Sequence, residues 1–282
     1  MPSRAEATTL PSALGVIGLG RMAQALLLPL LEAGQLHPGA VCASVATEGS
    51  AARLTQVLGL HVGTDPRPCL AAPVLLLALK PQQLEGLLRA LAPLPSPPPP
   101  PPGLERPLLV SVLAGVPLQR LHDAFPGWDV VRCVPNAPAL VRRGLIGVSV
   151  AETLAPAARQ LAHALLSPVG RVLDLPESQL DAFLALTSSG PAFVALVIEA
   201  LADGAVAAGL PRAQALELAQ AMAAGSLELL ERQQLHPAQL KDMVASPGGT
   251  TMAGLRRLEA AGLRSALIEA VVAAWERSRA LA

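Results

Sequence analysis

The chain of 282 residues contains no tyrosine, and aromatic residues make up only 2% of its composition. Lysine and arginine together number 21, as do aspartate and glutamate, so the formal net charge at pH 7 is zero. Proteins that bind nucleic acid usually carry a basic face, often with aromatic side chains that stack on bases. The composition therefore argues against nucleic acid as a partner.

Cysteine is also scarce. The three cysteines (Cys42, Cys69 and Cys133) are scattered and form no Cys-x-x-Cys pair, which is typical of a reduced intracellular protein. The first residues include Arg4 and Glu6 and contain no apolar run of about 7–15 residues, so no secretory leader is expected. We predict a cytoplasmic protein.

Long uncharged apolar runs are missing too, although hydrophobic residues make up 52% of the chain and the mean hydropathy is +0.47. The longest run, Pro191–Leu210, is interrupted by Glu199 and Asp203. A membrane span requires about 20 apolar residues with few or no charges, so we expect a buried helix and no membrane association. Because this segment is apolar almost all round, we expect it to be buried between subunits or in a large core.

The first half of the chain alternates short apolar runs with helical patterns. The predicted strands are Leu14–Gly18, Ala40–Val45, Val74–Leu79, Leu108–Val112, Val130–Val134, Ile146–Val150 and Arg171–Leu175. The predicted helices are Arg21–Ala33, Ser50–Leu58, Pro81–Leu91, Pro117–Phe125 and Ala155–Leu166. Such alternation predicts an α/β fold with a doubly wound, mostly parallel sheet.

The strand pattern stops after Leu175, and only helices are predicted beyond it. They are Glu177–Leu186, Pro191–Ala208, Arg212–Gln233, Thr251–Ala261 and Arg264–Leu281. We therefore expect two domains, residues 1–175 and residues 176–282. Residues 95–102, a serine among seven prolines, predict an exposed polyproline II loop at the periphery of the first domain. A tolerated surface insertion explains this loop better than a ligand for an SH3-like domain.

A glycine-rich motif, Gly18-Leu19-Gly20-Arg21-Met22-Ala23, lies directly after the first predicted strand. In dinucleotide-binding turns, the first glycine makes the tight turn and the second lets the backbone approach a pyrophosphate. The following helix N-terminus offers free N–H groups and a positive dipole to the phosphates. We interpret the motif as a dinucleotide-binding turn, with an ordinary glycine turn as the alternative.

The residues after the second strand bear on the choice of cofactor. Sites that prefer NAD usually carry an acid there, which holds the ribose 2′-hydroxyl. No carboxylate occurs from Ala43 to Thr47, before Glu48, whereas Ser44 and Thr47 are compatible with a 2′-phosphate and Arg53 follows nearby. The pattern favours NADPH modestly and leaves NADH open.

Two further segments stand at the carboxyl ends of predicted strands, where doubly wound sheets bind ligands. Lys80-Pro81 follows a very apolar strand, and lysine occurs only twice in the chain. Asn136 lies between two prolines, and its side chain can both donate and accept hydrogen bonds. We expect both segments to face the ligand crevice; a solvated lysine and ordinary turn chemistry are the alternatives.

In the helical half, Ser246-Pro247-Gly248-Gly249-Thr250-Thr251 stands at the start of a predicted helix. This segment gathers hydroxyls and unhindered N–H groups at a positive helix end, which suits a small carboxylate. The alternative is an ordinary helix start with serine or threonine as its N-cap. Two glycines and two threonines are more than a cap requires, so we favour binding of a small anion.

Together these motifs resemble those of the pyrroline-5-carboxylate reductases over essentially the whole chain. The matching segments, in the family's order, are residues 16–23, 79–81, 134–138, 189–193 and 246–259. The resemblance implies a Rossmann-like N-terminal domain followed by an all-helical dimerisation domain, with the active site at the dimer interface. It also implies NAD(P)H-dependent reduction of the imine 1-pyrroline-5-carboxylate to L-proline, the last step of proline biosynthesis. Assembly of homodimers into a larger ring-like oligomer is left open.

The resemblance also implies roles for individual residues. Those expected at the cofactor are Gly18, Leu19, Gly20, Arg21 and Met22 at the phosphates, and Lys80, Pro81 and Asn136 near the nicotinamide ribose. Those expected at the substrate are Ser246, Gly248, Gly249 and Thr250 for its carboxylate, and Thr251 as the catalytic partner of its ring nitrogen. The family's Ser-Gly-Ser-Gly-Pro-Ala-Tyr is replaced by Thr187-Ser188-Ser189-Gly190-Pro191-Ala192-Phe193, so one glycine and one phenol are lost.

No general acid–base pair stands out, and no metal is expected. Imine reduction mainly requires that two reactants be oriented and water excluded, with Thr251 as the hydrogen-bonding group for the nitrogen. A β-hydroxyacid dehydrogenase is the nearest rival, but its catalytic lysine would have to be Lys241, which precedes the serine–glycine loop. A non-catalytic dinucleotide sensor or helical scaffold would be expected to show a damaged loop, and residues 246–251 are intact.

Overall fold

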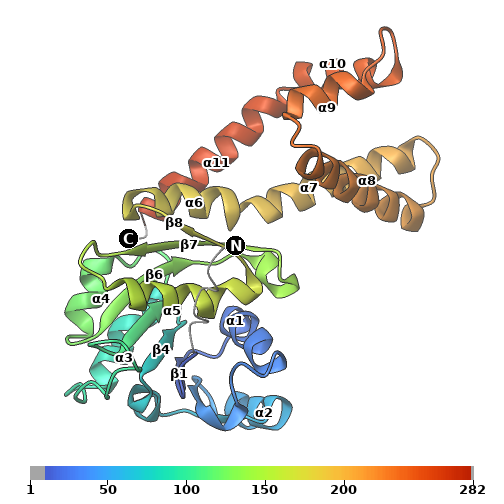
Figure 1. Cartoon of the computed structure of the whole chain (residues 1–282). Coiled ribbons are helices and arrows are strands. Elements are labelled where there is room, and N and C mark those ends of the chain that lie inside the picture. Colours follow the sequence, from blue (N-terminus) through green and yellow to red (C-terminus); the bar gives the residue numbers. More distant parts are fainter. Residues whose placement is uncertain (1–9, 281–282) are drawn as a thin grey trace, which may run out of the picture. The chain divides into compact units, whose positions relative to one another are not determined.

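The computed structural model describes residues 10–280, so Arg4 and Glu6, on which the expected lack of a leader rests, lie outside the described residues. The chain forms two compact units (Figure 1). One, here called the sheet unit, contains the chain up to Ser188 and again from Trp275. The other, the helical unit, runs from Ser189 to Ala274.

The sheet unit is built on one eight-stranded sheet. Its strands are β1 (Leu14–Ile17), β2 (Val41–Ser44), β3 (His61–Gly63), β4 (Val74–Leu77), β5 (Leu108–Ser111), β6 (Asp129–Val134), β7 (Gly144–Val150) and β8 (Gly170–Asp174). They lie in the order β3-β2-β1-β4-β5-β6-β7-β8, and only the β6–β7 pair is antiparallel. The predicted doubly wound, mostly parallel sheet is confirmed. Its strand order reverses between β1 and β4, and such a switch point is where these sheets bind ligands.

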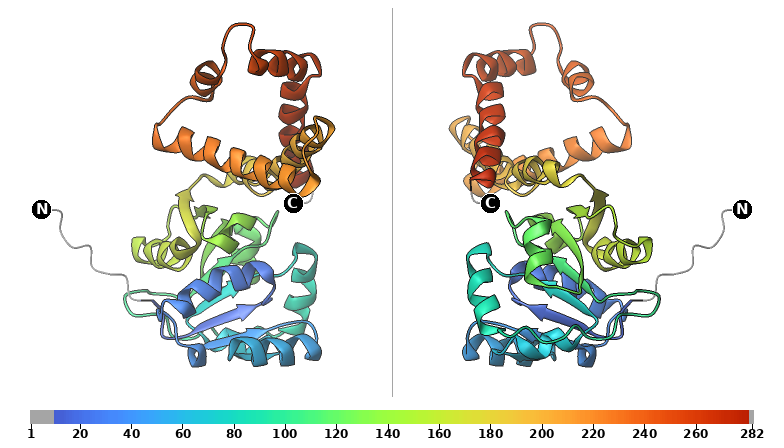
Figure 2. Two further views of the ribbon diagram at one scale, coloured as in Figure 1. Left: turned by 90° about the vertical axis from the view of Figure 1, so that its right-hand side faces the viewer. Right: turned by 90° about the vertical axis from the view of Figure 1, so that its left-hand side faces the viewer.

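Helices cover both faces of this sheet (Figure 2). The α-helices of the sheet unit are α1 (Arg21–Glu32), α2 (Glu48–Leu58), α3 (Leu84–Ala90), α4 (Leu118–Ala124), α5 (Pro156–Leu166) and α6 (Leu180–Thr187). The 3₁₀-helices are η1 (Pro38–Ala40), η2 (Arg67–Ala71), η3 (Pro81–Gln83), η4 (Ala137–Val141), η5 (Ser167–Val169) and η6 (Glu177–Gln179). Helices α1, α2 and α5 share a core with one face of the sheet, and α3 and α4 share a core with the other.

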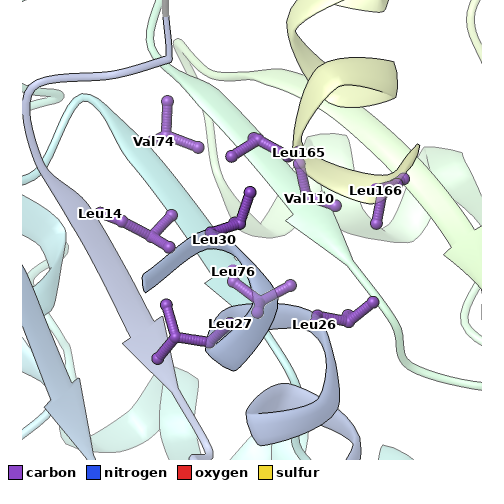
Figure 3. A pocket seen from close by; sticks show the side chains of 9 residues that line it. All are labelled: Leu14, Leu26, Leu27, Leu30, Val74, Leu76, Val110, Leu165 and Leu166. Carbon is purple, nitrogen blue, oxygen red and sulfur yellow. The ribbon is translucent and has the colours of Figure 1, made fainter. Parts of the chain in front are cut away.

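The central strands are buried on both faces, which explains their unbroken apolar sequence. In β4, Val74 and Leu76 join the core under α1 and α5, whereas Leu75 and Leu77 join the core under α3 and α4. Figure 3 shows leucines of α1 and α5 pointing toward the side chains of β1, β4 and β5. They enclose a void of about 20 Å³ with an apolar lining, which offers a water molecule no hydrogen-bond partner.

Polar contacts attach α6 to the rest of the sheet unit. The buried Arg132 of β6 donates to Glu177 Oε1 at 2.7 Å, just before α6 begins. Within α6, Asp181 accepts a hydrogen bond of 2.8 Å from Ser278 near the C-terminus. These contacts place both α6 and the chain after Trp275 in the sheet unit.

The helical unit buries very little of its own surface. Its helices are α7 (Gly190–Ala207), α8 (Arg212–Arg232), α9 (Pro237–Val244), α10 (Thr250–Ala260) and the larger part of α11 (Leu263–Arg279). Helices α7 and α8 pack together, and the buried apolar residues at their contact are Ala202, Ala215 and Ala219. Leu196 on α7 is 66% exposed. A single chain therefore does not provide the burial expected for this apolar helix.

Most predicted strands and α-helices match the observed ones to within a few residues, and one observed strand and one observed α-helix were not predicted. Strand β3 has only three residues, and α9 has eight. Both are too short for a clear periodic pattern. The helix predicted at Pro81–Leu91 consists of η3 followed by α3.

The proline-rich loop of residues 95–102 contains no helix or strand and is mostly exposed. Pro101 is buried, and Pro97 lies so close to Gly127 that an added Cβ there would be 2.8 Å from the proline ring. The loop therefore packs on the turn that precedes β6.

Candidate active site

A cavity of about 620 Å³ lies at the carboxyl ends of β1, β2 and β4, beside the switch point of the sheet. The residues predicted at the cofactor that line it are Gly18, Leu19, Gly20, Arg21, Ser44 and Lys80. Three cationic side chains line the cavity (Arg21, Arg53 and Lys80), and no carboxylate among the described residues does. Its size and charge suit an anionic ligand as large as a dinucleotide.

Gly18 makes the turn that leads out of β1. Its φ is +94°, and an added Cβ would lie 2.6 Å from the carbonyl oxygen of Ala78 on the neighbouring strand exit. The Ser44 carbonyl accepts hydrogen bonds from the N–H groups of Gly18 and Leu19, at 2.9 and 3.3 Å. Those two N–H groups hold the loop against β2, so Gly18 and Leu19 shape the site more than they donate into it.

Gly20 differs, because nothing within the chain requires a glycine there. Its φ is −80°, which any residue adopts, and no heavy atom lies within 4 Å of an added Cβ. Helix α1 begins at Arg21, and the first N–H groups of a helix have no partner within it. The backbone N–H groups of Arg21 and Met22 are therefore available to a phosphate that approaches over Gly20.

Lys80 follows β4 and is exposed at the cavity. Its backbone N–H donates to Gln83 Oε1 at 3.1 Å, which fixes the turn into η3. Pro81 begins η3 and is half-buried, as is Met22 in the first turn of α1, and neither side chain lines the cavity. Their predicted places beside a cofactor remain predictions.

Asn136 was expected to face the ligand crevice, but its side chain is buried and bonded to backbone groups. Its side chain is 4% exposed; Nδ2 donates to the Thr187 carbonyl at 2.9 Å, and Oδ1 accepts from the Leu145 N–H at 2.9 Å. Ser188 Oγ adds a bond of 3.3 Å to the Pro135 carbonyl. The amide thus braces the loop after β6 against the end of α6, and it does not line the cavity.

The serine–glycine loop lies in the helical unit, between α9 and α10. Gly248 has a φ of +69°, and the Gly249 N–H donates to the Ser246 carbonyl at 3.0 Å. The Ser246 hydroxyl occupies the space that a Cβ on Gly249 would need. The positive φ of Gly248 therefore favours glycine there, whereas a side chain on Gly249 would require the Ser246 hydroxyl to move.

The hydroxyls of this loop are not used to cap α10. Its N-cap is Gly249, with no side-chain hydrogen bond, so the alternative of an ordinary serine or threonine cap is wrong. Among the described residues, the hydroxyls of Ser246, Thr250 and Thr251 have no hydrogen-bond partner within the chain. Thr250 and Thr251 occupy the first turn of α10, where unpaired N–H groups also point out of the helix. The arrangement can hold a small anion and donate one further hydrogen bond.

Arg256 was not singled out from the sequence. It lines a hollow of about 540 Å³ together with Gly248, Gly249 and Met252. The sequence signal that could have found Arg256 is its spacing of four residues from Met252, because residues three or four apart lie on the same face of a helix. Lys241, the acid–base group required by the rival dehydrogenase, is exposed on α9 and does not line this hollow.

Comparison with known proteins identifies the family. Residues 177–281 match the family model described as pyrroline-5-carboxylate reductase dimerisation. Residues 13–115 match the one described as NADP oxidoreductase, coenzyme F420-dependent. The pyrroline-5-carboxylate reductase of Synechocystis sp. is 43% identical to this chain over 269 residues, which cover 95% of this chain and 97% of that protein. The chain belongs to the pyrroline-5-carboxylate reductase family.

Solved structures of the family have the same fold. The pyrroline-5-carboxylate reductase of Coxiella burnetii matches with a TM-score of 0.83 at 29% identity, covering 96% of this chain and 99% of that one. The pyrroline carboxylate reductase of Plasmodium falciparum, solved with NADP bound, matches with a TM-score of 0.82 at 26% identity, covering 95% and 97%. The predicted Rossmann-like domain followed by a helical dimerisation domain is confirmed.

The family assignment also bears on the exposed apolar helix. Residues Glu177–Ala207 form a helical stretch that is long and apolar enough, by length and composition alone, to cross a membrane. Within it, 18 consecutive residues have a mean hydropathy of 1.7, and only 11% of them are buried in the single chain. The stretch falls within the segment matched by the dimerisation model. Its exposed apolar surface is therefore assigned to contacts between copies of the chain.

Proposed function

We propose that this chain transfers a hydride from NADPH or NADH to the carbon–nitrogen double bond of 1-pyrroline-5-carboxylate and releases L-proline, as the last step of proline biosynthesis. The observation that carries the proposal is the presence of two complementary sites in one chain. One is a crevice lined by three cations and no described carboxylate, and the other is a helix start with unused hydroxyls. Both occur in a family whose members are named for this reduction.

The sheet unit would hold the cofactor. Its phosphates fit the N–H groups of Arg21 and Met22, where Gly20 leaves the approach open. Lys80 and Pro81 would lie beside the nicotinamide ribose, and Asn136 would act there through the loop that it braces. The exclusion of carboxylates from the described lining favours NADPH modestly over NADH.

The helical unit would hold the imine. The substrate carboxylate would be bound by the residues of the serine–glycine loop, namely Ser246, Gly248, Gly249 and Thr250. The hydroxyl of Thr251 would donate a hydrogen bond to the ring nitrogen, which becomes an amine as the hydride supplied by the cofactor arrives. Because a C=N bond is readily protonated, no acid–base pair is required, and orientation of the two reactants contributes about 7–11 kcal/mol.

The assignment of regions follows from these roles. We propose residues 1–175 as the dinucleotide-binding domain and residues 176–282 as the domain for dimerisation and substrate binding. The match of residues 177–281 to the dimerisation model supports this division and a homo-oligomer. A homodimer in the cytoplasm, with further assembly into a ring-like oligomer, is proposed on the family resemblance.

The function is tested by turnover. Purified protein is supplied with saturating 1-pyrroline-5-carboxylate and either reduced cofactor, and proline is measured as well as loss of nicotinamide absorbance. We expect proline to form in equal molar amount to the cofactor oxidised, faster with NADPH. Oxidation of a 3-hydroxy acid in a parallel assay with NAD⁺ or NADP⁺, without imine turnover, would instead support the rival dehydrogenase.

A further inference from the structure

One end of the cofactor crevice is rich in hydroxyls. Ser44 at the end of β2, Ser50 and Arg53 on α2, and Thr64 after β3 all line it. Thr47 caps α2, because its Oγ1 accepts from the Ser50 N–H at 3.3 Å and donates to Ser50 Oγ at 2.9 Å. In a doubly wound sheet, the end of the second strand receives the adenosine ribose.

Two carboxylates, those of Glu48 and Asp65, adjoin residues at this end of the crevice. Asp65 accepts a hydrogen bond of 3.0 Å from the Arg67 N–H and does not line the cavity. Glu48 is the first residue of α2, yet it does not line the cavity. Its Oε1 accepts a hydrogen bond of 2.6 Å from the hydroxyl of Thr64, and this is the short distance expected of a charge-assisted bond. Because β2 and β3 are parallel neighbours, the residues that follow them emerge at the same edge, which brings Glu48 and Thr64 together.

The position of the Glu48 carboxylate matters to the choice of cofactor. A carboxylate beside the adenosine ribose accepts a hydrogen bond from the 2′-hydroxyl of NAD and repels the 2′-phosphate of NADP. Glu48 lies four residues after the end of β2, and the Thr64 hydroxyl gives its carboxylate a partner outside the crevice lining. Arg53 then lines the crevice without a carboxylate from the described residues beside it.

We propose that Thr64 determines cofactor selectivity by tethering the Glu48 carboxylate outside the crevice, so that the 2′-phosphate of NADP is admitted beside Arg53. The proposal rests on the proposed function only in assuming a nicotinamide dinucleotide in this crevice. Without the tether, the carboxylate is free to reach the ribose, and selectivity shifts toward NAD. Thr64 acts through Glu48 and is a positioning residue.

The test measures binding to the full-length chain, independently of turnover. Dissociation constants for NADP⁺ and NAD⁺ are determined by isothermal titration calorimetry for the wild type, Thr64→Val, Thr64→Ser and Thr64→Val/Glu48→Gln. Loss of one exposed hydrogen bond to a charged group should change the ratio of the two constants about five- to tenfold in favour of NAD⁺ in Thr64→Val. Thr64→Ser keeps the hydroxyl and should retain the wild-type ratio, and the double variant should return to it.

Thr55→Val is the matched control. Thr55 lies on α2, and its hydroxyl makes a long bond of 3.5 Å to the Val62 carbonyl without lining the crevice. This variant should leave the ratio unchanged. An unchanged ratio in Thr64→Val, an equal loss of both affinities, or a double variant that stays shifted would each overturn the proposal.

Failure of the proposed function gives a different pattern. If the wild type binds both dinucleotides but reduces no imine, the function is wrong and the ratios still decide the role of Thr64. If the wild type binds neither dinucleotide, both proposals fall.

Discussion

The sheet unit and the helical unit differ in how much apolar surface each buries by itself. In the sheet unit, the central strands are buried on both faces, under α1, α2 and α5 on one side and α3 and α4 on the other. In the helical unit, the buried apolar residues are three alanines, and most of the large apolar side chains that are exposed in the described chain lie there. The first unit has a core of its own, whereas the second requires another copy to cover it.

The largest effect is expected from a charge on the exposed face of α7. Leu196→Glu would place a carboxylate in the surface assigned to contacts between copies, where an unpaired buried charge costs several kcal/mol. We expect the homo-oligomer to dissociate in size-exclusion chromatography with light scattering. Val57→Glu on α2 is the matched control, because Val57 is 68% exposed and Leu196 66%. An intact oligomer in Leu196→Glu would show that α7 lies outside the interface.

A large effect on the cofactor is expected from Gly20→Val. A Cβ at this position meets no atom of the chain within 4 Å, and a valine side chain would obstruct the approach to the helix N-terminus, so the fold should survive. Loss of one to two charge-assisted hydrogen bonds should weaken dinucleotide binding on the order of 100-fold. Gly18→Val should instead lower the melting temperature, because its φ is positive and Ala78 blocks its Cβ. Normal cofactor affinity in Gly20→Val would contradict the assigned crevice.

A smaller effect is expected from truncating one leucine in each unit, and only in the helical unit should the loss of stability depend on protein concentration. Leu27→Ala removes a side chain that is 1% exposed in the core of the sheet unit and should cost about 2–5 kcal/mol. Leu218→Ala in the helical unit removes one that is 47% exposed in the single chain. Because association stabilises only the assembled state, the loss in Leu218→Ala should grow as the protein is diluted. If thermal melts show that Leu218→Ala lowers stability equally at all protein concentrations, the helical unit does not depend on a second copy for its burial.

The smallest effect concerns pH. Burial raises the pKa of the Cys133 thiol to about 12, and burial together with the neighbouring Cys42 raises the pKa of Cys69 to about 12. Unfolded thiols ionise near pH ~8.5, so above that pH the unfolded chain releases protons that the folded chain retains. The stability from these thiols is complete below that pH and is lost as the pH rises toward about 12.

Urea denaturation at about pH 8 and about pH 10 measures this loss. Cys133→Ala should show a smaller decline between the two pH values than the wild type does. An equal decline in both proteins would mean that Cys133 ionises in the folded chain as readily as in the unfolded one.

The difference in burial between the sheet unit and the helical unit also explains which features could be predicted from the sequence. Strands such as β4 are read easily, because burial on both faces leaves an unbroken apolar run. The glycine motif likewise placed Gly18 to Arg21 at the crevice, because its geometry is local. For the helical unit, the sequence showed that α7 is apolar but left open whether another subunit or a large core covers it.

Long-range hydrogen bonds were beyond the sequence. The amide of Asn136 is shared between Leu145 and Thr187, and the second partner lies 51 residues away. Glu48 and Thr64 are 16 residues apart and meet only because β3 pairs with β2, and β3 itself was too short to be predicted. Both side chains have roles set by tertiary pairing, which no local pattern records.

We propose that the helical unit supplies the chemistry at the imine nitrogen, while the sheet unit binds the cofactor. The most direct test is steady-state kinetics with cofactor titrations on Thr251→Ala and Thr251→Ser. In Thr251→Ala, we predict unchanged cofactor affinity and a parallel fall in kcat and kcat/KM of about 10²–10⁴-fold, with most activity retained in Thr251→Ser. Near-normal kcat/KM in a folded Thr251→Ala enzyme would contradict the claim.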